Sequence, residues 1–174
     1  MRKLVSALLV TVLALPLFAG EGGPSVLVDL DQVRKEGTVA PVDGISSAGQ
    51  PDEAALQVFA DSGYTVVIDM RGTDEDRGVE NFAGVVEGTG MSYVPFPIES
   101  QDEISFDNAN KLDALLQEAD GPVLIHCASG NRVGALLALR KSLSGASDEE
   151  ALAYGKDAGM TRLEPVVRKV LEAD

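Results

Sequence analysis

The 174-residue chain contains one cysteine, one histidine and no tryptophan. A single cysteine cannot form an internal disulfide, and one histidine with one cysteine is too few for a structural zinc site. Basic residues are also scarce, because 14 Lys and Arg stand against 28 Asp and Glu, for a net charge of −14. So acidic a surface repels nucleic acid and anionic lipid, and we expect neither as a partner. An anionic ligand must therefore be held by a local site.

Long apolar runs are absent except at the N-terminus. A basic pair at residues 2–3 precedes the almost wholly apolar stretch Leu4–Leu15, and the small residues Ala19-Gly20 follow. This order is typical of a secretory signal peptide over residues 1–20, and the run is short for a spanning helix, which needs ~20 apolar residues. We predict an exported protein, periplasmic or secreted, without stable membrane association after cleavage. An uncleaved anchor is the alternative.

The rest of the chain reads as one domain. Residues 21–38 are interpreted as an N-terminal extension, and strand and helix patterns alternate over residues 39–174 without an internal linker. Such alternation predicts an α/β fold with a central, mostly parallel sheet flanked by helices. The predicted strands are 39–46, 64–69, 91–97 and 123–126, and the predicted helices are 51–62, 75–87, 107–119, 131–143, 147–158 and 161–173.

The segment with the clearest chemistry joins the strand at 123–126 to the helix at 131–143. Small side chains in this loop let consecutive backbone N–H groups turn inward and form an anion site, to which the helix N-terminus adds its dipole. Arg132 supplies a planar fork suited to oxyanions, and dipole and arginine together stabilise a thiolate at Cys127. The predicted anion-binding loop is Ala128, Ser129, Gly130, Asn131 and Arg132.

The same pattern has a purely structural interpretation, in which Cys127 is a buried small hydrophobic residue and Gly130 only makes a turn. Strand, cysteine, small loop, arginine and helix start coincide within eight residues, and this favours the functional interpretation. We therefore predict that Cys127 is a nucleophile acting on a phosphate- or sulfur-containing anionic substrate.

The order His-Cys followed by an arginine resembles the loop of the cysteine-dependent phosphatases. Those enzymes place five residues between cysteine and arginine, whereas this chain places four. The shorter spacing is similar to that of rhodanese-type sulfurtransferases and of the beta-lactamase-hydrolase-like, phosphatase-like family. The resemblance to that family covers residues 40–172 and rests on Ser47–Pro51 (SAGQP), Val66–Arg71 followed by Glu75, Tyr93–Ile98, and Glu149–Thr161.

This resemblance implies the fold of the dual-specificity phosphatases and cleavage of phosphomonoesters through a phosphocysteine, with no cofactor. It also implies that His126 supports the loop; neighbouring strand side chains point to opposite faces, so His126 cannot act as a base facing Cys127. A histidine that only fills the core is the alternative. Val133 stands where the superfamily often has Ser or Thr, which assists the leaving thiolate. Arg71 either pairs with Glu75 or extends the anion site.

Cleavage of a phosphate ester also needs an acid that protonates the leaving oxygen. The loop after the strand at 91–97 offers Glu99, Asp102 and Glu103. Alignment of Tyr93 with the matching strand of the resembled phosphatases places Glu99 or Ser100 near the acid's usual position, where this chain has no aspartate. Glu99 is closest to the strand, so we rank it first and Asp102 second. A solvated acidic loop without a catalytic role is the alternative.

Three functions remain open at this point. The first is a phosphatase of protein tyrosine, dual-specificity or small-molecule type. The second is a rhodanese-like sulfurtransferase that carries a sulfane sulfur on Cys127, for which the shorter loop is favourable and no acid is needed. The third is a non-catalytic anion-binding module. The natural substrate and the oligomeric state are not predicted.

Overall fold

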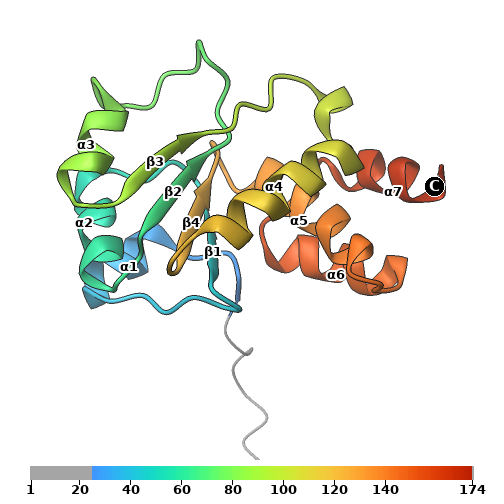
Figure 1. Cartoon of the computed structure of the whole chain (residues 1–174), viewed down its shortest axis with the longest axis horizontal. Coiled ribbons are helices and arrows are strands. Elements are labelled where there is room, and N and C mark those ends of the chain that lie inside the picture. Colours follow the sequence, from blue (N-terminus) through green and yellow to red (C-terminus); the bar gives the residue numbers. More distant parts are fainter. Residues whose placement is uncertain (1–24, 174) are drawn as a thin grey trace, which may run out of the picture.

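The central feature of the fold is a four-stranded sheet with helices on both faces (Figure 1). The computed structural model describes residues 25–173, so the predicted signal peptide lies outside the described residues. All strand pairs are parallel, in the order β1-β4-β2-β3. The predicted α/β fold with a mostly parallel sheet is confirmed. The strands are β1 (Ile45–Ala48), β2 (Val66–Asp69), β3 (Ser92–Pro95) and β4 (Val123–His126).

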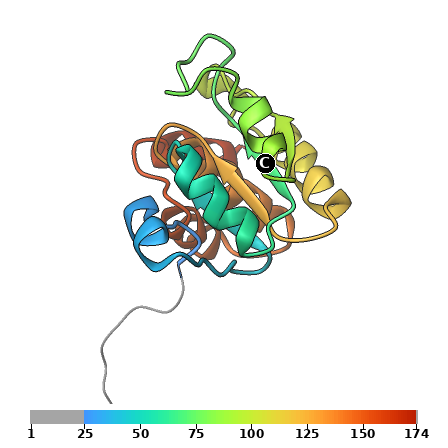
Figure 2. The same ribbon diagram turned by 90° about the vertical axis from the view of Figure 1, so that its left-hand side faces the viewer.

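Two sets of helices enclose this sheet. The first set, on one face, is α1 (Leu30–Glu36), α2 (Glu53–Asp61) and α3 (Phe82–Gly88). The second set is α4 (Phe106–Glu118) and α5 (Asn131–Leu143), with α6 (Asp148–Asp157) and α7 (Glu164–Glu172) packed on α5. Figure 2, seen from the side of α2, places α2 in front of the sheet and the C-terminal helices behind it. A short 3₁₀ helix, η1 (Gln101–Glu103), precedes α4.

Strand β4 and helix α5 have the predicted bounds, but two other predicted elements are wrong over much of their length. The predicted helix 75–87 begins only at Phe82, because Gly78 has φ +70° and Asn81 caps the helix from a left-handed conformation. The predicted strand 39–46 begins only at Ile45, after a turn in which Asp43 and Gly44 both have positive φ. Positive φ ends a regular helix or strand locally.

The described part of the predicted N-terminal extension is packed onto the domain. The Val28 N–H donates to the Ser47 carbonyl, and the Ser47 N–H donates to the Val26 carbonyl, so the segment lies along the outer edge of β1. Val26 and Val33 are buried. Residues 25–36 therefore complete the core on the β1 side.

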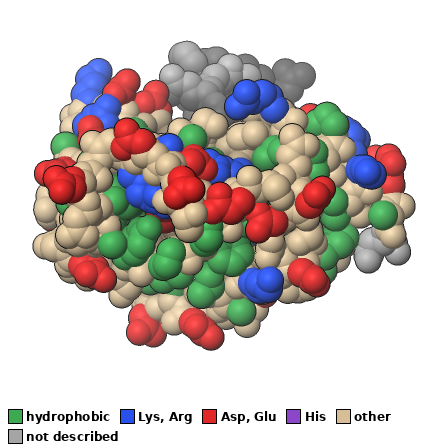
Figure 3. Space-filling view, turned by 90° about the horizontal axis from the view of Figure 1, so that it is seen from above, with side chains coloured by type: hydrophobic (Ala, Val, Ile, Leu, Met, Phe, Trp, Pro, Cys, Tyr) green, Lys and Arg blue, Asp and Glu red, His purple; other side chains and the backbone are tan. Residues whose placement is uncertain are grey.

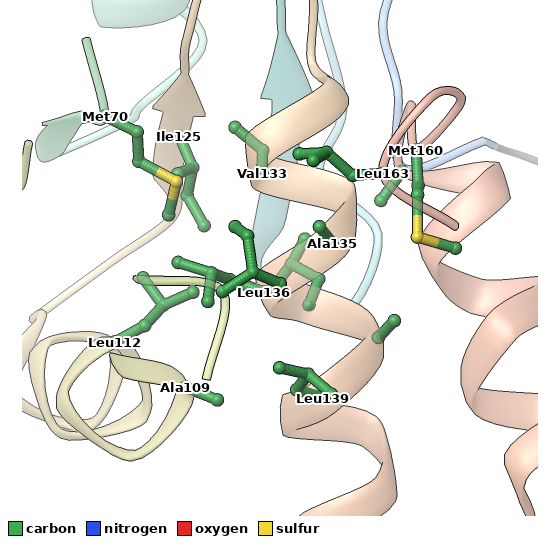
Figure 4. Close-up of a cluster of buried hydrophobic side chains, with 14 of the residues drawn as sticks. Met70, Ala109, Leu112, Ile125, Val133, Ala135, Leu136, Leu139, Met160 and Leu163 are labelled. Atoms are coloured by element: carbon green, nitrogen blue, oxygen red, sulfur yellow. The ribbon is translucent and has the colours of Figure 1, made fainter. Parts of the chain in front are cut away.

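Helix α5 forms the centre of the core behind the site. Its residues from 133 to 139 are all buried, since the sheet, α4, α6 and α7 surround it (Figure 4). Gly134 permits the close approach of α6: a Cβ at this position would lie 2.3 Å from the Met160 nitrogen and 2.4 Å from the Gly155 carbonyl oxygen. Among residues 25–173, no helix has the length and apolarity needed to cross a membrane.

Candidate active site

The predicted anion-binding loop, residues 128–132 and called the anion loop below, lies at the carboxyl end of β4, where α/β folds commonly bind ligands. Cys127 directly follows the strand and is only 1% exposed. Gly130, the N-cap of α5, has φ +80° and ψ −12°, and a Cβ there would also lie 2.8 Å from the Leu27 side chain. Glycine is therefore required at position 130 by both backbone conformation and space. A bridge between Gly49 and Ser129 holds the outer part of the loop against the segment after β1.

Arg132, in the first turn of α5, is held by two partners from other segments. Its Nη1 donates to Glu75 Oε1 at 2.5 Å and to the Ile98 carbonyl at 3.0 Å, and its Nη2 donates to Glu75 Oε2 at 2.9 Å. The hydrogen bonds to Glu75 raise the pKa of Arg132, and the nearby Cys127 thiol acts in the same direction. The guanidinium is thus fixed beside the thiol.

Sequence reasoning named Glu75 only as a possible partner of Arg71 and missed its contact with Arg132. Besides Arg132, its carboxylate accepts from the Gly72 N–H at 2.8 Å and lies 3.3 Å from Arg71 Nε. The hydrogen bonds from Arg132 are the main reason that the pKa of Glu75 falls to about 2, so it is ionised at neutral pH. The only sequence signal that drew attention to Glu75 was its place four residues after Arg71. Arg71 does pair with Glu75, as one of the two interpretations held, and Glu75 in turn positions Arg132.

His126 lies on the opposite side of the sheet from Cys127, as the strand alternation predicts. Its ring is fully buried, packs against Phe82 with centroids 5.2 Å apart, and has Nε2 3.5 Å from Asp69 Oδ1. Burial lowers the pKa of His126 to about 4, so the ring is neutral at neutral pH. His126 is thus a buried, neutral ring on the face of the sheet opposite Cys127, and neither of its ring nitrogens has a hydrogen-bond partner among the described residues.

The buried carboxylate of Asp69 anchors the loop that carries Glu75. It accepts hydrogen bonds from Arg77 Nε at 2.6 Å and from the Tyr93 hydroxyl at 2.8 Å. Burial alone would raise the pKa of Asp69, but His126 and the hydrogen-bond donors outweigh it and lower the pKa. Arg77 also donates to the Glu75 carbonyl at 2.9 Å, so Asp69 and Arg77 together fix the position of Glu75.

The three acidic candidates occupy different places. Glu99 lines the same cavity as Arg132, of about 310 Å³, and its Oε1 accepts from the backbone N–H of Thr73 at 2.8 Å and from its hydroxyl at 3.0 Å. Asp102 lines a neighbouring cavity that does not include Arg132. Glu103 caps η1, accepting from the Glu99 and Ser100 N–H groups. Of the three, only Glu99 lines the cavity that Arg132 also lines.

The side chain of Asn131 points away from the anion site. Its Oδ1 accepts from the Thr161 N–H at 2.7 Å, from the Thr161 hydroxyl at 3.2 Å and from the Leu163 N–H at 3.3 Å. Asn131 thus contributes its backbone to the loop and its carboxamide to the connection between α6 and α7. That connection brings Arg162 to the cavity of Arg132, which no sequence pattern indicated.

Two further features bear on the chemistry. Val133 is fully buried and offers no hydroxyl beside the loop, in agreement with the departure noted in the sequence. Among residues 25–173 there is no group of three or more His, Cys, Asp or Glu side chains able to hold a metal ion.

The parallel sheet between two helical layers is the fold of the tyrosine and dual-specificity phosphatases. This chain carries a thiol at the end of one strand of that sheet and an arginine on the following helix. The chain belongs to the family of phosphatase-like domains of beta-lactamase hydrolase-like proteins, whose model matches residues 38–144. The match ends before α6, so it does not extend to the resemblance noted at Glu149–Thr161. No curated protein matches the chain by sequence.

Solved structures share the fold. A candidate phosphatase of Neisseria meningitidis is 23% identical, with a TM-score of 0.62 over 74% of this chain and 92% of that one. A candidate phosphatase of Shewanella putrefaciens is 20% identical, with a TM-score of 0.54 over 73% and 81% of the two chains. Tk-PTP in its active form is 20% identical, with a TM-score of 0.53 over 74% and 91%. At these identities the likeness concerns the fold.

Proposed function

We propose that this protein is an exported, cysteine-dependent phosphatase that cleaves phosphomonoesters through a phosphocysteine intermediate. The observation that carries the proposal is the pairing of Arg132 with Glu75, which fixes a guanidinium beside the Cys127 thiol at the mouth of the anion loop. An arginine held in this way binds a phosphoryl group without first having to be ordered.

The donors left on Arg132 fit a phosphoryl group. A guanidinium has five N–H donors, and those not engaged by Glu75 and the Ile98 carbonyl are Nε–H and one hydrogen on Nη2. These two point in parallel from one edge of the guanidinium, which is the arrangement that binds two oxygens of a phosphate. The inward backbone N–H groups of the loop bind the remaining oxygen.

The reaction proceeds in two displacements. The Cys127 thiolate attacks phosphorus, the ester P–O bond breaks, and the leaving oxygen takes a proton from a carboxylic acid. Water then attacks phosphorus and gives a proton to the same carboxylate, the S–P bond breaks, inorganic phosphate leaves, and both the thiolate and the carboxylic acid are restored. Glu99 is our candidate for the acid, and its carboxyl must leave the Thr73 donors and turn towards the substrate for this role.

One observation favours a sulfurtransferase instead. Only four residues separate Cys127 from Arg132, and a short loop suits a persulfide, which needs neither an acid nor a hydroxyl at position 133. The deciding experiment compares hydrolysis of an aryl phosphate with sulfur transfer from thiosulfate to cyanide, using the purified chain and its Cys127→Ser variant. Cys127-dependent release of phosphate supports the proposal. Cys127-dependent formation of thiocyanate without phosphate release refutes it.

Export is tested separately. A reporter that folds only outside the cytoplasm is fused after Gly20 in a bacterial host, and a second fusion lacks residues 2–15. We expect reporter activity only from the first fusion. A reporter that stays inactive in both fusions rejects the signal peptide.

A further inference from the structure

The connection between α6 and α7 is fixed directly onto the anion loop. The Asn131 carboxamide accepts hydrogen bonds from residues on both sides of Arg162, namely from the Thr161 N–H and hydroxyl and from the Leu163 N–H. Two residues before Arg162, the Met160 nitrogen would lie 2.3 Å from a Cβ at position 134, so only glycine fits at that position of α5. The backbone at position 162 therefore has a set position relative to Cys127 and Arg132.

Arg162 differs from every other arginine in residues 25–173. The other six each lie within 4 Å of a carboxylate oxygen, whereas Arg162 has no such ion pair and no side-chain hydrogen bond among these residues. In a chain with twice as many acidic as basic side chains, an arginine without a carboxylate partner is unusual. Figure 3, looking onto the end where the strands terminate, shows how closely acidic and basic side chains are interleaved on this face.

Arg162 lines the cavity of about 310 Å³ that also contains Arg132. The two carboxylates on this cavity are already engaged, Glu75 by Arg132 and Arg71, and Glu99 by the donors of Thr73. Arg162 therefore brings a guanidinium without a carboxylate partner among residues 25–173 to the wall of the cavity that Arg132 also lines. Such a guanidinium fork suits carboxylate or phosphate oxygens.

We infer that Arg162 binds a second anionic group, a carboxylate or a phosphate, on the substrate whose first phosphate occupies the Cys127 loop. The inference rests on the proposed phosphatase function and narrows its substrate class to phosphomonoesters with a second negative charge close by. There is room for such a substrate, because a neighbouring cavity of about 470 Å³ shares Gln101 and Ile104 with the first.

The test is a binding measurement with ligand pairs that differ in the second charge. The first pair is a phosphotyrosyl peptide with glutamate or glutamine next to the phosphotyrosine. The second pair is 1,3-phenylene bisphosphate and phenyl phosphate. Dissociation constants are measured by calorimetry on the Cys127→Ser chain, which cannot turn the ligands over, alone and combined with Arg162→Gln. Arg168→Gln is the matched control, since Arg168 lies in α7 and pairs with Glu164.

In the Cys127→Ser chain we expect at least one doubly charged ligand to bind about five- to tenfold more tightly than its singly charged partner, as for one exposed charge-assisted contact. Arg162→Gln brings this ratio close to one, and Arg168→Gln leaves it in place. The pair that shows the preference identifies the source of the second charge, a peptide side chain or a second phosphate. The preference also weakens with added salt.

Three outcomes overturn the inference: no preference in either pair, a preference that survives Arg162→Gln, or no binding of any of the four ligands. Failure of the proposed function looks different. In that case the wild-type chain shows no Cys127-dependent hydrolysis of the same ligands, although the binding preference and its loss in Arg162→Gln are observed.

Discussion

Replacing Glu75 with glutamine removes the charge that holds Arg132 while keeping the size of the side chain. The carboxylate has both oxygens on Arg132, at 2.5 and 2.9 Å, and a third contact with Arg71 Nε at 3.3 Å. Glutamine keeps one acceptor, but its NH₂ group faces a guanidinium N–H. We therefore expect a loss of stability together with a loss of Arg132 orientation.

The size of the effect follows from the pKa of Glu75. A fall from 4.5 to about 2 corresponds to ~3 kcal/mol of preference for the ionised form in the folded protein. One third of the Glu75 side chain is exposed, so solvent screening reduces this to about 1–2 kcal/mol. Because the folded pKa is depressed, this stability is present above pH 4.5 and is lost as the pH falls towards 2.

The assay is urea unfolding of the wild type and of Glu75→Gln at pH 7, 5 and 3. Glu80→Gln is the control, because Glu80 is an exposed residue of the same loop with no ion pair or hydrogen bond of its side chain among the described residues. We expect a stability difference of about 1–2 kcal/mol at pH 7 that shrinks at pH 3. We also expect kcat/KM for an aryl phosphate to fall about ten- to a hundredfold, since a catalytic group has been misplaced. Equal behaviour of the two variants would refute the role assigned to Glu75.

Four further predictions concern other parts of the site and its support. Arg132→Lys should weaken inhibition by vanadate about tenfold or more although the charge is kept, because an ammonium cannot form two parallel hydrogen bonds; unchanged inhibition would show that Arg132 does not bind two oxygens of the anion. Glu99→Gln should lower turnover of an alkyl phosphate by ~10²-fold or more and that of nitrophenyl phosphate far less, whereas the control Asp102→Asn should change neither; equal small effects of Glu99→Gln on both substrates exclude Glu99 as the acid. The pKa of His126 is depressed in the folded protein, so the free energy of unfolding of the wild type should decrease as the pH falls from 6.5 to 4. His126→Gln should make the free energy of unfolding less dependent on pH over that range; the same pH dependence in both proteins would contradict a buried, neutral His126. Gly134→Ala should destabilise the fold by about 1–3 kcal/mol in urea unfolding, because the added methyl meets backbone atoms that cannot move aside; a neutral change would mean that α5 and α6 are not tightly packed.

The segment from β4 to α5 could be predicted from the sequence because its determinants are local. A run of β-branched and aliphatic residues ends at Cys127, small residues follow, and Gly130 marks the helix start. Burial of α5 on all sides also agrees with its apolar sequence. Each of these features acts over a few residues, so no knowledge of distant contacts was needed.

The partner of Arg132 could not be predicted for the opposite reason. Glu75 lies 57 residues away in the sequence, on a loop whose shape depends on the buried pair of Asp69 and Arg77. Sequence reasoning placed Glu75 at the start of a helix over residues 75–87, whereas the structure begins that helix only at Phe82. The hydrogen bonds of Arg77 to loop carbonyls stabilise an irregular path that composition does not reveal.

The role of Arg162 was hidden for a similar reason. Nothing in the residues around it distinguishes it from an exposed arginine at a helix start. Its position at the cavity depends on Asn131, which sequence reasoning assigned to the anion loop alone. The spacing of residues in the sequence does not reveal that the backbone of Asn131 belongs to the loop while its side chain holds the connection between α6 and α7.

The two outer strands of the sheet bear on how this protein behaves at high concentration. An uncovered strand edge can pair with another molecule and start aggregation. The edge of β1 is already paired with the segment Val26–Val28, and β3 ends in Pro95, which lacks an N–H and is followed by Pro97 after one residue. Proline on an outer strand blocks the growth of a sheet by strand addition. Over the described residues both edges therefore resist pairing with a strand of another molecule.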